Sequence, residues 1–192
     1  VPAASGALEL IARPGGFGGT AEGFQPYSAE VGASVTDQGY TLTLDGIGVD
    51  EAFITLYATI TGEEPIPNWG GEEETGPAVW PLNLRAEGRE LEAWGAQTEW
   101  ERLDSHAIKL TQRCPVMTVL PAVVELEVYT DQLVPRVRGN WSLDLLVDKT
   151  APDGESLVAE PNQTFTVDGQ RITVEKVAVA PSGGGLVLST KS

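Results

Sequence analysis

Short runs of alternating apolar and polar residues are the feature of this sequence that most restricts its fold. Residues 40–45 read Tyr-Thr-Leu-Thr-Leu-Asp, so one side of the segment is apolar and the other is polar. Because successive side chains of an extended strand point to opposite faces, this period of two indicates a β-strand rather than a helix. Residues 53–60 alternate again, with apolar or β-branched side chains on both faces, which predicts a central strand covered on both sides.

Comparable strand candidates recur along the rest of the chain and are separated by turn residues. They are residues 79–85, 90–94, 107–112, 123–129, 141–147, 163–167, 171–179 and 186–190. Asp168-Gly169 predicts a hairpin, because a type I′ turn needs positive φ at both central positions. Residues 93–103 follow a helical period but include Gly95 and two tryptophans. Many short strands with few helical patterns predict an all-β fold, an antiparallel immunoglobulin-like β-sandwich with additional C-terminal strands.

Composition divides the chain into three regions. Residues 13–23 contain five glycines and one proline, which favours a flexible loop, so we expect residues 1–30 to be a tether. We expect residues 31–148 to form the immunoglobulin-like sandwich, interrupted by a long acidic loop over 62–77. Residues 149–192 are C-terminal β strands that either start a second β domain or complete the first, because they are too few for a second sandwich.

The charge of the chain excludes two classes of partner. The 192 residues include 12 Lys and Arg against 28 Asp and Glu, which gives a net charge of −16. Nucleic-acid binding depends on clustered basic residues, and so does docking on anionic lipid. We therefore expect no nucleic-acid partner, while the hydrophobic content of 41% is enough to form a core.

The supply of catalytic and metal-binding residues is small. Cys114 and His106 are the single cysteine and the single histidine, which excludes an intrachain disulfide and a Cys/His zinc site. A Ser-His-Asp triad or a Cys-His dyad would have to use these two residues, and neither lies in a recognisable catalytic signature. We interpret both as ordinary strand or loop residues.

Several carboxylates are paired along the sequence. Glu125 and Glu127 would share one face of a strand, and a glycosidase needs two carboxylates facing each other across a cleft. The other groups are Glu72 to Glu74, Glu99 with Glu101, and Asp144 with Asp148. A solvated acidic face explains these pairs more simply, and residues 148–155 fit a solvated turn better than a weak cation site. We expect no catalytic, cofactor or metal residues, and the ligand-binding residues are unknown.

Five tryptophans are many for this length: Trp69, Trp80, Trp94, Trp100 and Trp141. Trp80 and Trp141 lie within strand patterns and are predicted to be core residues. Trp69 lies in the acidic loop and is predicted to be exposed. Exposed aromatic rings can stack on sugars, so they keep a carbohydrate-binding module open as an alternative.

Three segments resemble a known family. Residues 35–51 (VTDQGYTLTLDGIGVDE), followed by FITLY at 53–57, resemble the opening of the DUF4179 family, uncharacterised extracytoplasmic domains of Gram-positive bacterial membrane proteins. Residues 139–148 (GNWSLDLLVD) resemble the closing strand of that domain. Residues 163–188 resemble the start of a β domain that often follows it. The resemblance begins near Tyr27 and matches residues 62–120 poorly.

The resemblance implies a location and a role. Members of the family have a short cytoplasmic region, often similar to an anti-sigma factor, then one membrane helix and then the exported domain. By analogy, residues 1–30 would be membrane-proximal, and the only membrane contact would be through a missing N-terminal helix. We therefore expect a non-catalytic extracytoplasmic sensing or binding domain of a single-pass, membrane-anchored cell-surface protein, linked to sigma-factor regulation, with an unknown extracellular ligand or protein partner.

Two alternatives stay open. The first is a cell-surface binding module for envelope polysaccharide or an adhesin-type protein partner, which would use exposed aromatic residues and edge strands. The second is an enzyme such as a glycosidase, which would need a deep cleft with two facing carboxylates. No residue of the family has a known catalytic role that could be transferred to this chain.

Overall fold

A computed structural model describes residues 8–10, 28–68, 79–91, 96–149, 156–180 and 182–191. The regular secondary structure among these residues is β-strand, and none of them belongs to a helix able to span a membrane. The strands are β1 (Leu8–Leu10), β2 (Ala29–Asp37), β3 (Tyr40–Val49), β4 (Phe53–Gly62), β5 (Asn83–Ala86), β6 (Arg89–Leu91), β7 (Gln97–Arg102), β8 (Ala107–Pro115), β9 (Val123–Thr130), β10 (Trp141–Asp148), β11 (Leu157–Ala159), β12 (Gln163–Val167), β13 (Gln170–Ala180) and β14 (Gly183–Lys191).

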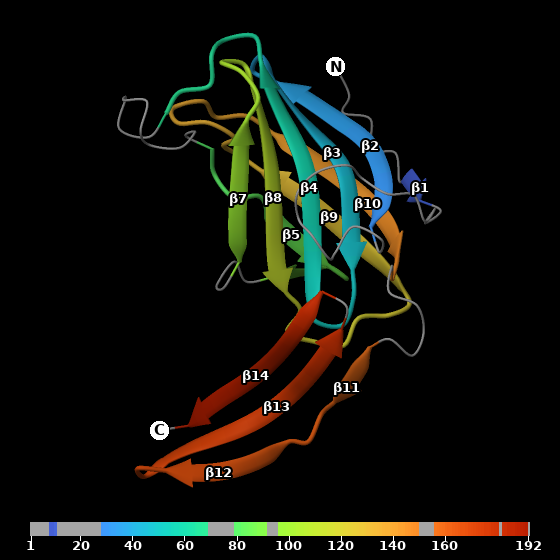
Figure 1. Ribbon diagram of the computed structural model, residues 1–192, viewed down its shortest axis with the longest axis vertical. Coiled ribbons are helices and arrows are strands. Elements are labelled where there is room, and N and C mark those ends of the chain that lie inside the picture. Colours follow the sequence, from blue (N-terminus) through green and yellow to red (C-terminus); the bar gives the residue numbers. More distant parts are fainter. Residues whose placement is uncertain are drawn as a thin grey trace.

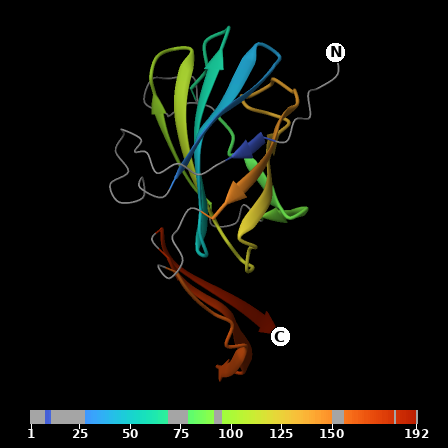
Figure 2. The same ribbon diagram turned by 90° about the vertical axis from the view of Figure 1, so that its right-hand side faces the viewer.

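Two five-stranded sheets pack face to face as a β-sandwich. The first sheet has the order β2-β3-β4-β8-β7, and the second has the order β1-β10-β9-β5-β6. Every pairing is antiparallel except that β1 runs parallel to β10. Figures 1 and 2 show the two layers with the remaining strands below them. The predicted antiparallel sandwich with additional C-terminal strands is confirmed.

The alternation in the sequence explains the packing of the first sheet. Leu42 and Leu44 of β3 are fully buried, and β4 lies between β3 and β8 as the predicted central strand. The prediction that β4 is covered on both sides is wrong for its outer face, where Tyr57 and Thr59 are only half-buried and Thr61 is exposed. The apolar faces of these strands meet those of β9 and β10 from the second sheet in one continuous core.

Trp141, the first residue of β10, joins the two sheets at the end of the core where β3 begins. Its side chain is fully buried, and its Nε1 donates a hydrogen bond of 2.9 Å to the carbonyl oxygen of Tyr40 in β3. Gly139 lies directly beneath the indole, where a Cβ would come within 2.5 Å of it. The prediction that Trp141 is a core residue is confirmed.

The corresponding prediction for Trp80 is wrong. Trp80 is 42% exposed, whereas Val79 is buried and faces the core. The neighbouring Leu82 is also held in the core, because the buried amide of Gln112 in β8 pairs with both of its backbone groups, at 2.8 and 2.7 Å. This pairing connects the start of β5 to the opposite sheet.

Three hairpins use tight turns with positive φ at both central positions. The predicted turn at Asp168-Gly169 has φ values of 49° and 80°, which confirms it. Gln38-Gly39 and Glu87-Gly88 have the same conformation. The right-handed twist of a hairpin favours this geometry, and glycine adopts its second position at little steric cost.

Some strands lie where the sequence indicated other structure. β1, Ser28 and the start of β2 fall within the expected tether over 1–30, and the remainder of that region lies outside the described residues. β7 occupies part of the run with a helical period, because its pairing with β8 imposes the extended conformation. The predicted acidic loop over 62–77 is described only as far as residue 68, because residues 69–78 lie outside the described residues.

The last four strands form a sheet of their own, called the C-terminal sheet below. β13 pairs with β12 and β11 along one edge and with β14 along the other. In Figure 1 this sheet extends from the lower end of the sandwich. Whether residues 149–192 count as a second domain or as part of the first stays a prediction.

Candidate functional site

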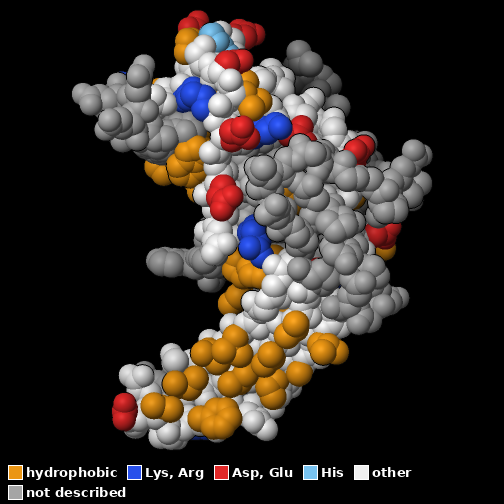
Figure 3. All heavy atoms as spheres, viewed as in Figure 1, with side chains coloured by type: hydrophobic (Ala, Val, Ile, Leu, Met, Phe, Trp, Pro, Cys, Tyr) orange, Lys and Arg blue, Asp and Glu red, His pale blue; other side chains and the backbone are white. Residues whose placement is uncertain are grey.

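One face of the C-terminal sheet is predominantly apolar, and most of its apolar side chains are open to solvent, with Gln163, Gln170 and Thr190 as its uncharged polar residues. The strand register places ten apolar residues on this side, and we call them the apolar face: Leu157, Ala159, Phe165, Val167, Ile172, Val174, Val177, Val179, Leu186 and Leu188. Leu157 is 72% exposed and Leu186 is 59% exposed. Figure 3 shows these hydrophobic side chains spread over the whole sheet. No residue that the register pairs on this face carries a charge.

The opposite face of the same sheet is buried near the sandwich and polar at its far end. Near the sandwich, Ala178, Ala180 and Val187 are buried, and the two alanines pack with Ala52 from the β3–β4 connection. At the far end the face is polar, and Thr164 and Thr173 share a hydrogen bond of 2.9 Å between their hydroxyls. A sheet with one solvated face has its polar side chains there. The apolar face is therefore the side suited to burial.

Lys176 attaches the C-terminal sheet to the sandwich. Its side chain is only 2% exposed, and its Nζ donates hydrogen bonds to the carbonyl oxygens of Glu51 (2.9 Å), Val116 (3.1 Å) and Thr118 (2.9 Å). Burial lowers the pKa of the Lys176 ammonium, and the carboxylate of Glu51 opposes this shift. All three donors of the ammonium are satisfied, so the contact fixes this part of β13 to two loops of the sandwich.

A second set of contacts lies beside Lys176. Asp50, which is 1% exposed, accepts hydrogen bonds from the backbone N–H groups of Ala52 and Phe53 through Oδ1 and from that of Ser182 through Oδ2. Arg113 of β8 donates to the carbonyl oxygen of Ser182 and stacks 4.4 Å from the centre of the Phe53 ring. The sheet is therefore held by charged and apolar contacts together, and the apolar face keeps a defined orientation.

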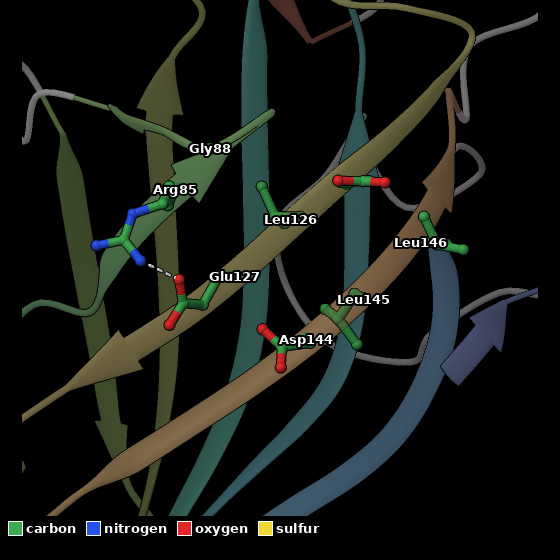
Figure 4. A pocket seen from close by; sticks show the side chains of 8 residues that line it. Arg85, Gly88, Leu126, Glu127, Asp144, Leu145 and Leu146 are labelled. Carbon is green, nitrogen blue, oxygen red and sulfur yellow. Dashed lines mark hydrogen bonds and ion pairs between the residues drawn. The ribbon is translucent and has the colours of Figure 1, made fainter. Parts of the chain in front are cut away.

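An open depression of about 330 Å³ lies on the outer surface of the second sheet. In Figure 4, Arg85, Glu127 and Asp144 project from β5, β9 and β10 to the same side. The register places Glu127 directly opposite both Arg85 and Asp144. Glu125 also lines the depression, so the expectation that Glu125 and Glu127 share one strand face is confirmed.

The carboxylate of Glu127 is already engaged by neighbouring side chains. Arg85 forms an ion pair with it, and the hydroxyl of Ser142 donates to it at 3.1 Å. A glycosidase holds two carboxylates facing each other across a cleft, whereas here Glu127 is only partly buried and Asp144 is exposed.

A hydrogen-bonded network extends from the depression to the edge of the sheet. Tyr129 donates to both oxygens of Glu90 at 2.6 Å, and Arg85 donates to Glu90 at 2.6 Å and lies over the Tyr129 ring. The hydrogen bond from Tyr129 has the largest effect on Glu90, followed by that from Arg85, and both lower the pKa of the Glu90 carboxyl. The hydrogen bond to Glu90 in turn raises the pKa of the Tyr129 hydroxyl. The network fixes the Arg85 guanidinium above β9.

The structure separates the two residues that a Cys-His dyad would need. His106 is exposed just before β8, whereas Cys114 is buried near the end of that strand. Eight residues of extended chain span about 26 Å. Burial also raises the pKa of the Cys114 thiol. These positions agree with the interpretation of both as ordinary strand or loop residues.

Some of the remaining candidate residues from the sequence lie in described parts of the chain, and others lie outside them. Trp100 of β7 is 43% exposed, and Glu99 and Glu101 on the same edge strand are exposed too. Within the described ranges, no three His, Cys, Asp or Glu side chains lie together in a way that could hold a metal ion. The following candidates lie outside the described residues: Trp69, Trp94, Glu72 to Glu74, and the residues 150–155 of the considered cation turn.

Comparisons with known proteins support the fold. No model of a known protein family matches the chain, and no curated protein matches it. A crystal structure of a conserved domain protein from Bacillus anthracis resembles it with a TM-score of 0.54 and 13% sequence identity. The likeness covers 83% of this chain and 54% of that one, so the chain spans about half the length of that protein. At this identity the likeness shows the fold alone.

The apolar face is the functional candidate that sequence analysis missed. A signal for it was present, because residues 163–167 and 171–174 alternate between apolar and polar side chains. An alternating strand is also expected when its apolar side covers a core. Only the arrangement of β13 and β14 shows that this side is uncovered.

Proposed function

We propose that the chain is a non-catalytic binding domain that acts through the apolar face of the C-terminal sheet. The observation that carries this proposal is ten apolar side chains on one uncharged face of a sheet that is fixed to the sandwich. Soluble monomers rarely expose so large a contiguous apolar patch unless it serves an interaction. The open, solvated surroundings of the paired carboxylates near Arg85 also favour binding over catalysis.

The location of this binding domain is proposed from the resemblance to the DUF4179 family. The domain would be the extracytoplasmic part of a single-pass bacterial membrane protein, anchored at the cell surface by a helix encoded upstream. Binding at its surface would change the state of a cytoplasmic region that regulates a sigma factor. The many contacts around Lys176 support the mechanical part of this proposal, because a rigid attachment can transmit a displacement of the C-terminal sheet to the sandwich.

The coding sequence upstream of the codon for Val1 tests the proposed location. We expect about 20 consecutive apolar residues, the length of a membrane-spanning helix, preceded by a small cytoplasmic region. A cleavable signal peptide with no residues before it would contradict membrane anchoring and sigma-factor regulation. The chain would then be a secreted binding module.

A second candidate function is a cell-surface module that binds envelope polysaccharide or an adhesin-type protein. The exposure of Trp80 and Trp100 favours it, because exposed indole rings can stack on sugars. Affinity electrophoresis in gels containing cell-wall polysaccharide tests it with Trp80→Ala, Trp100→Ala and the unmodified chain. Retardation that either substitution reduces would support carbohydrate binding, and equal migration of all three with and without polysaccharide would contradict it.

A further inference from the structure

The C-terminal sheet has the construction of half a β-sandwich. Its apolar side chains alternate with those of the other face apart from one register shift between Val174 and Lys176, and that other face is mostly packed on the sandwich or polar. In a β-sandwich, the apolar faces of two such sheets pack about 10 Å apart with interdigitated side chains. The second layer is absent from the described part of the chain, so this core lacks one side.

We propose that a second copy of this chain supplies the missing layer, and that two C-terminal sheets pack face to face as a symmetric dimer. A twofold axis brings the same patch of both subunits together, so each patch must complement itself. An uncharged face on which aliphatic and phenyl groups predominate meets this condition, because apolar surfaces attract each other without directional partners. The inference deepens the proposed binding function and rests on the apolar face as its binding surface.

The distribution of charge favours the same occupant. Across residues 156–191 there are three acidic residues (Glu160, Asp168 and Glu175) and three basic residues (Arg171, Lys176 and Lys191). This segment is therefore formally neutral, although the whole chain carries −16. Two copies repel each other through the charge on the remainder of the chain. A dimer that forms through the C-terminal sheets places these neutral segments against each other and keeps the acidic sandwiches apart, so the repulsion is smallest in this arrangement.

The size of the face predicts a dimer of modest affinity. A standard stable interface involves about 20–30 residues on each side, and the apolar face supplies ten side chains before rim residues are counted. Interfaces at the lower end of the size range form transient complexes. We therefore expect a reversible dimer with a dissociation constant in the micromolar range, tightened by added salt because salt screens the repulsion between acidic sandwiches.

Sedimentation equilibrium of the purified chain between about 1 and 200 µM tests the proposal across this affinity range. Leu186→Glu places a carboxylate at an exposed position of the apolar face, and we expect it to weaken dimerisation by more than about a hundredfold. Val167→Lys tests the far end of the face with the opposite charge. Thr166→Glu is the matched control, because Thr166 is exposed and precedes Val167 in β12 but lies on the polar face of that strand.

The proposal predicts that the unmodified chain and Thr166→Glu dimerise alike and that both substitutions in the apolar face give monomers with unchanged circular dichroism. A chain that stays monomeric at every concentration and salt level would overturn it, as would a dimer that survives both substitutions. Either of these results would leave the proposed binding function with a different partner. Failure of the proposed location would instead appear in the upstream coding sequence.

Discussion

At the scale of single residues, Lys176 combines two opposing contributions to stability. Transferring an ammonium group from water to the interior is unfavourable, and this is why its pKa lies below the ordinary value of 10.5. Three hydrogen bonds to carbonyl oxygens compensate for the lost hydration. Removing the ammonium would leave those three carbonyl oxygens without a hydrogen-bond donor at a buried contact. Lys176 therefore stabilises the folded arrangement of the two loops that supply these oxygens.

We predict that Lys176→Met loosens the C-terminal sheet by about 1–3 kcal/mol, the cost typical of leaving buried polar groups unpaired. Hydrogen exchange measured by mass spectrometry should show faster exchange in β13 and β14, with little change in β3 and β4. Arg171→Met is the control, because Arg171 is an exposed residue of the same strand. Equal exchange in the two variants would contradict this role of Lys176.

The lowered pKa of Lys176 also predicts a pH dependence with a definite sign. Between the lowered folded-state pKa and about 10.5, the unfolded chain binds more protons than the folded chain, so this group makes the free energy of unfolding rise with pH. Tyr40, Tyr57 and Tyr129 have raised pKa values. They act in the opposite direction above about pH 10, because there the folded state retains protons that the unfolded state loses.

A comparison of two chains separates these effects. The difference in unfolding free energy between the unmodified chain and Lys176→Met should rise as the pH approaches 10.5, because the tyrosines contribute equally to both. Urea titrations at a series of pH values measure this difference. A difference that is constant or that falls with rising pH would show that the folded state does not depress the pKa of Lys176.

At the scale of elements, Gln112 shows how a strand can bind a segment that has no strand partner at that point. Its amide pairs with the backbone N–H and carbonyl of Leu82, as another strand would. We predict that Gln112→Leu lowers the free energy of unfolding by about 2–4 kcal/mol, because both backbone groups would be left unpaired in the core. Lys109→Leu, at an exposed position of the same strand, should change it by less than about 0.5 kcal/mol. Chemical unfolding of both variants checks this prediction, and a small loss for Gln112→Leu would show that water can satisfy Leu82.

Local pattern was sufficient to predict most elements. Alternation located β3, β4, β9 and β10, because each has one side in the core. β2 escaped prediction from the sequence, although its less exposed residues alternate with exposed ones; they include small alanines, and the pairing with β3 shifts register between Glu30 and Ala33. The exposure of Trp80 also escaped prediction, because it depends on the pairing of Leu82 with Gln112 across the sandwich. Long-range contacts decided the cases that local pattern could not.

The candidate site was less predictable than the fold. The shared face of Glu125 and Glu127 followed from strand geometry, but the ion pair with Arg85 joins residues far apart in sequence. The apolar face could not be recognised because a sequence does not state which sheet faces are covered. Buried Lys176 gave no signal either, since its acceptors are backbone carbonyls that any residue type can provide.

At the scale of the whole molecule, the described residues form a sandwich with a buried core and an attached sheet. The sandwich buries its apolar residues between two layers, whereas the described part of the chain covers only one side of the C-terminal sheet. An antiparallel sheet of this kind gains stability when a second layer covers it. Binding at the apolar face is therefore expected to raise the local stability of β11 to β14.

Hydrogen exchange measured as a function of protein concentration tests this central claim most directly. If a second copy covers the apolar face, exchange in β13 and β14 should slow as the concentration rises through the micromolar range, while exchange in β3, β4 and β8 should stay constant. Leu186→Glu should abolish the concentration dependence. Exchange in the C-terminal sheet that is independent of concentration in the unmodified chain would contradict the account.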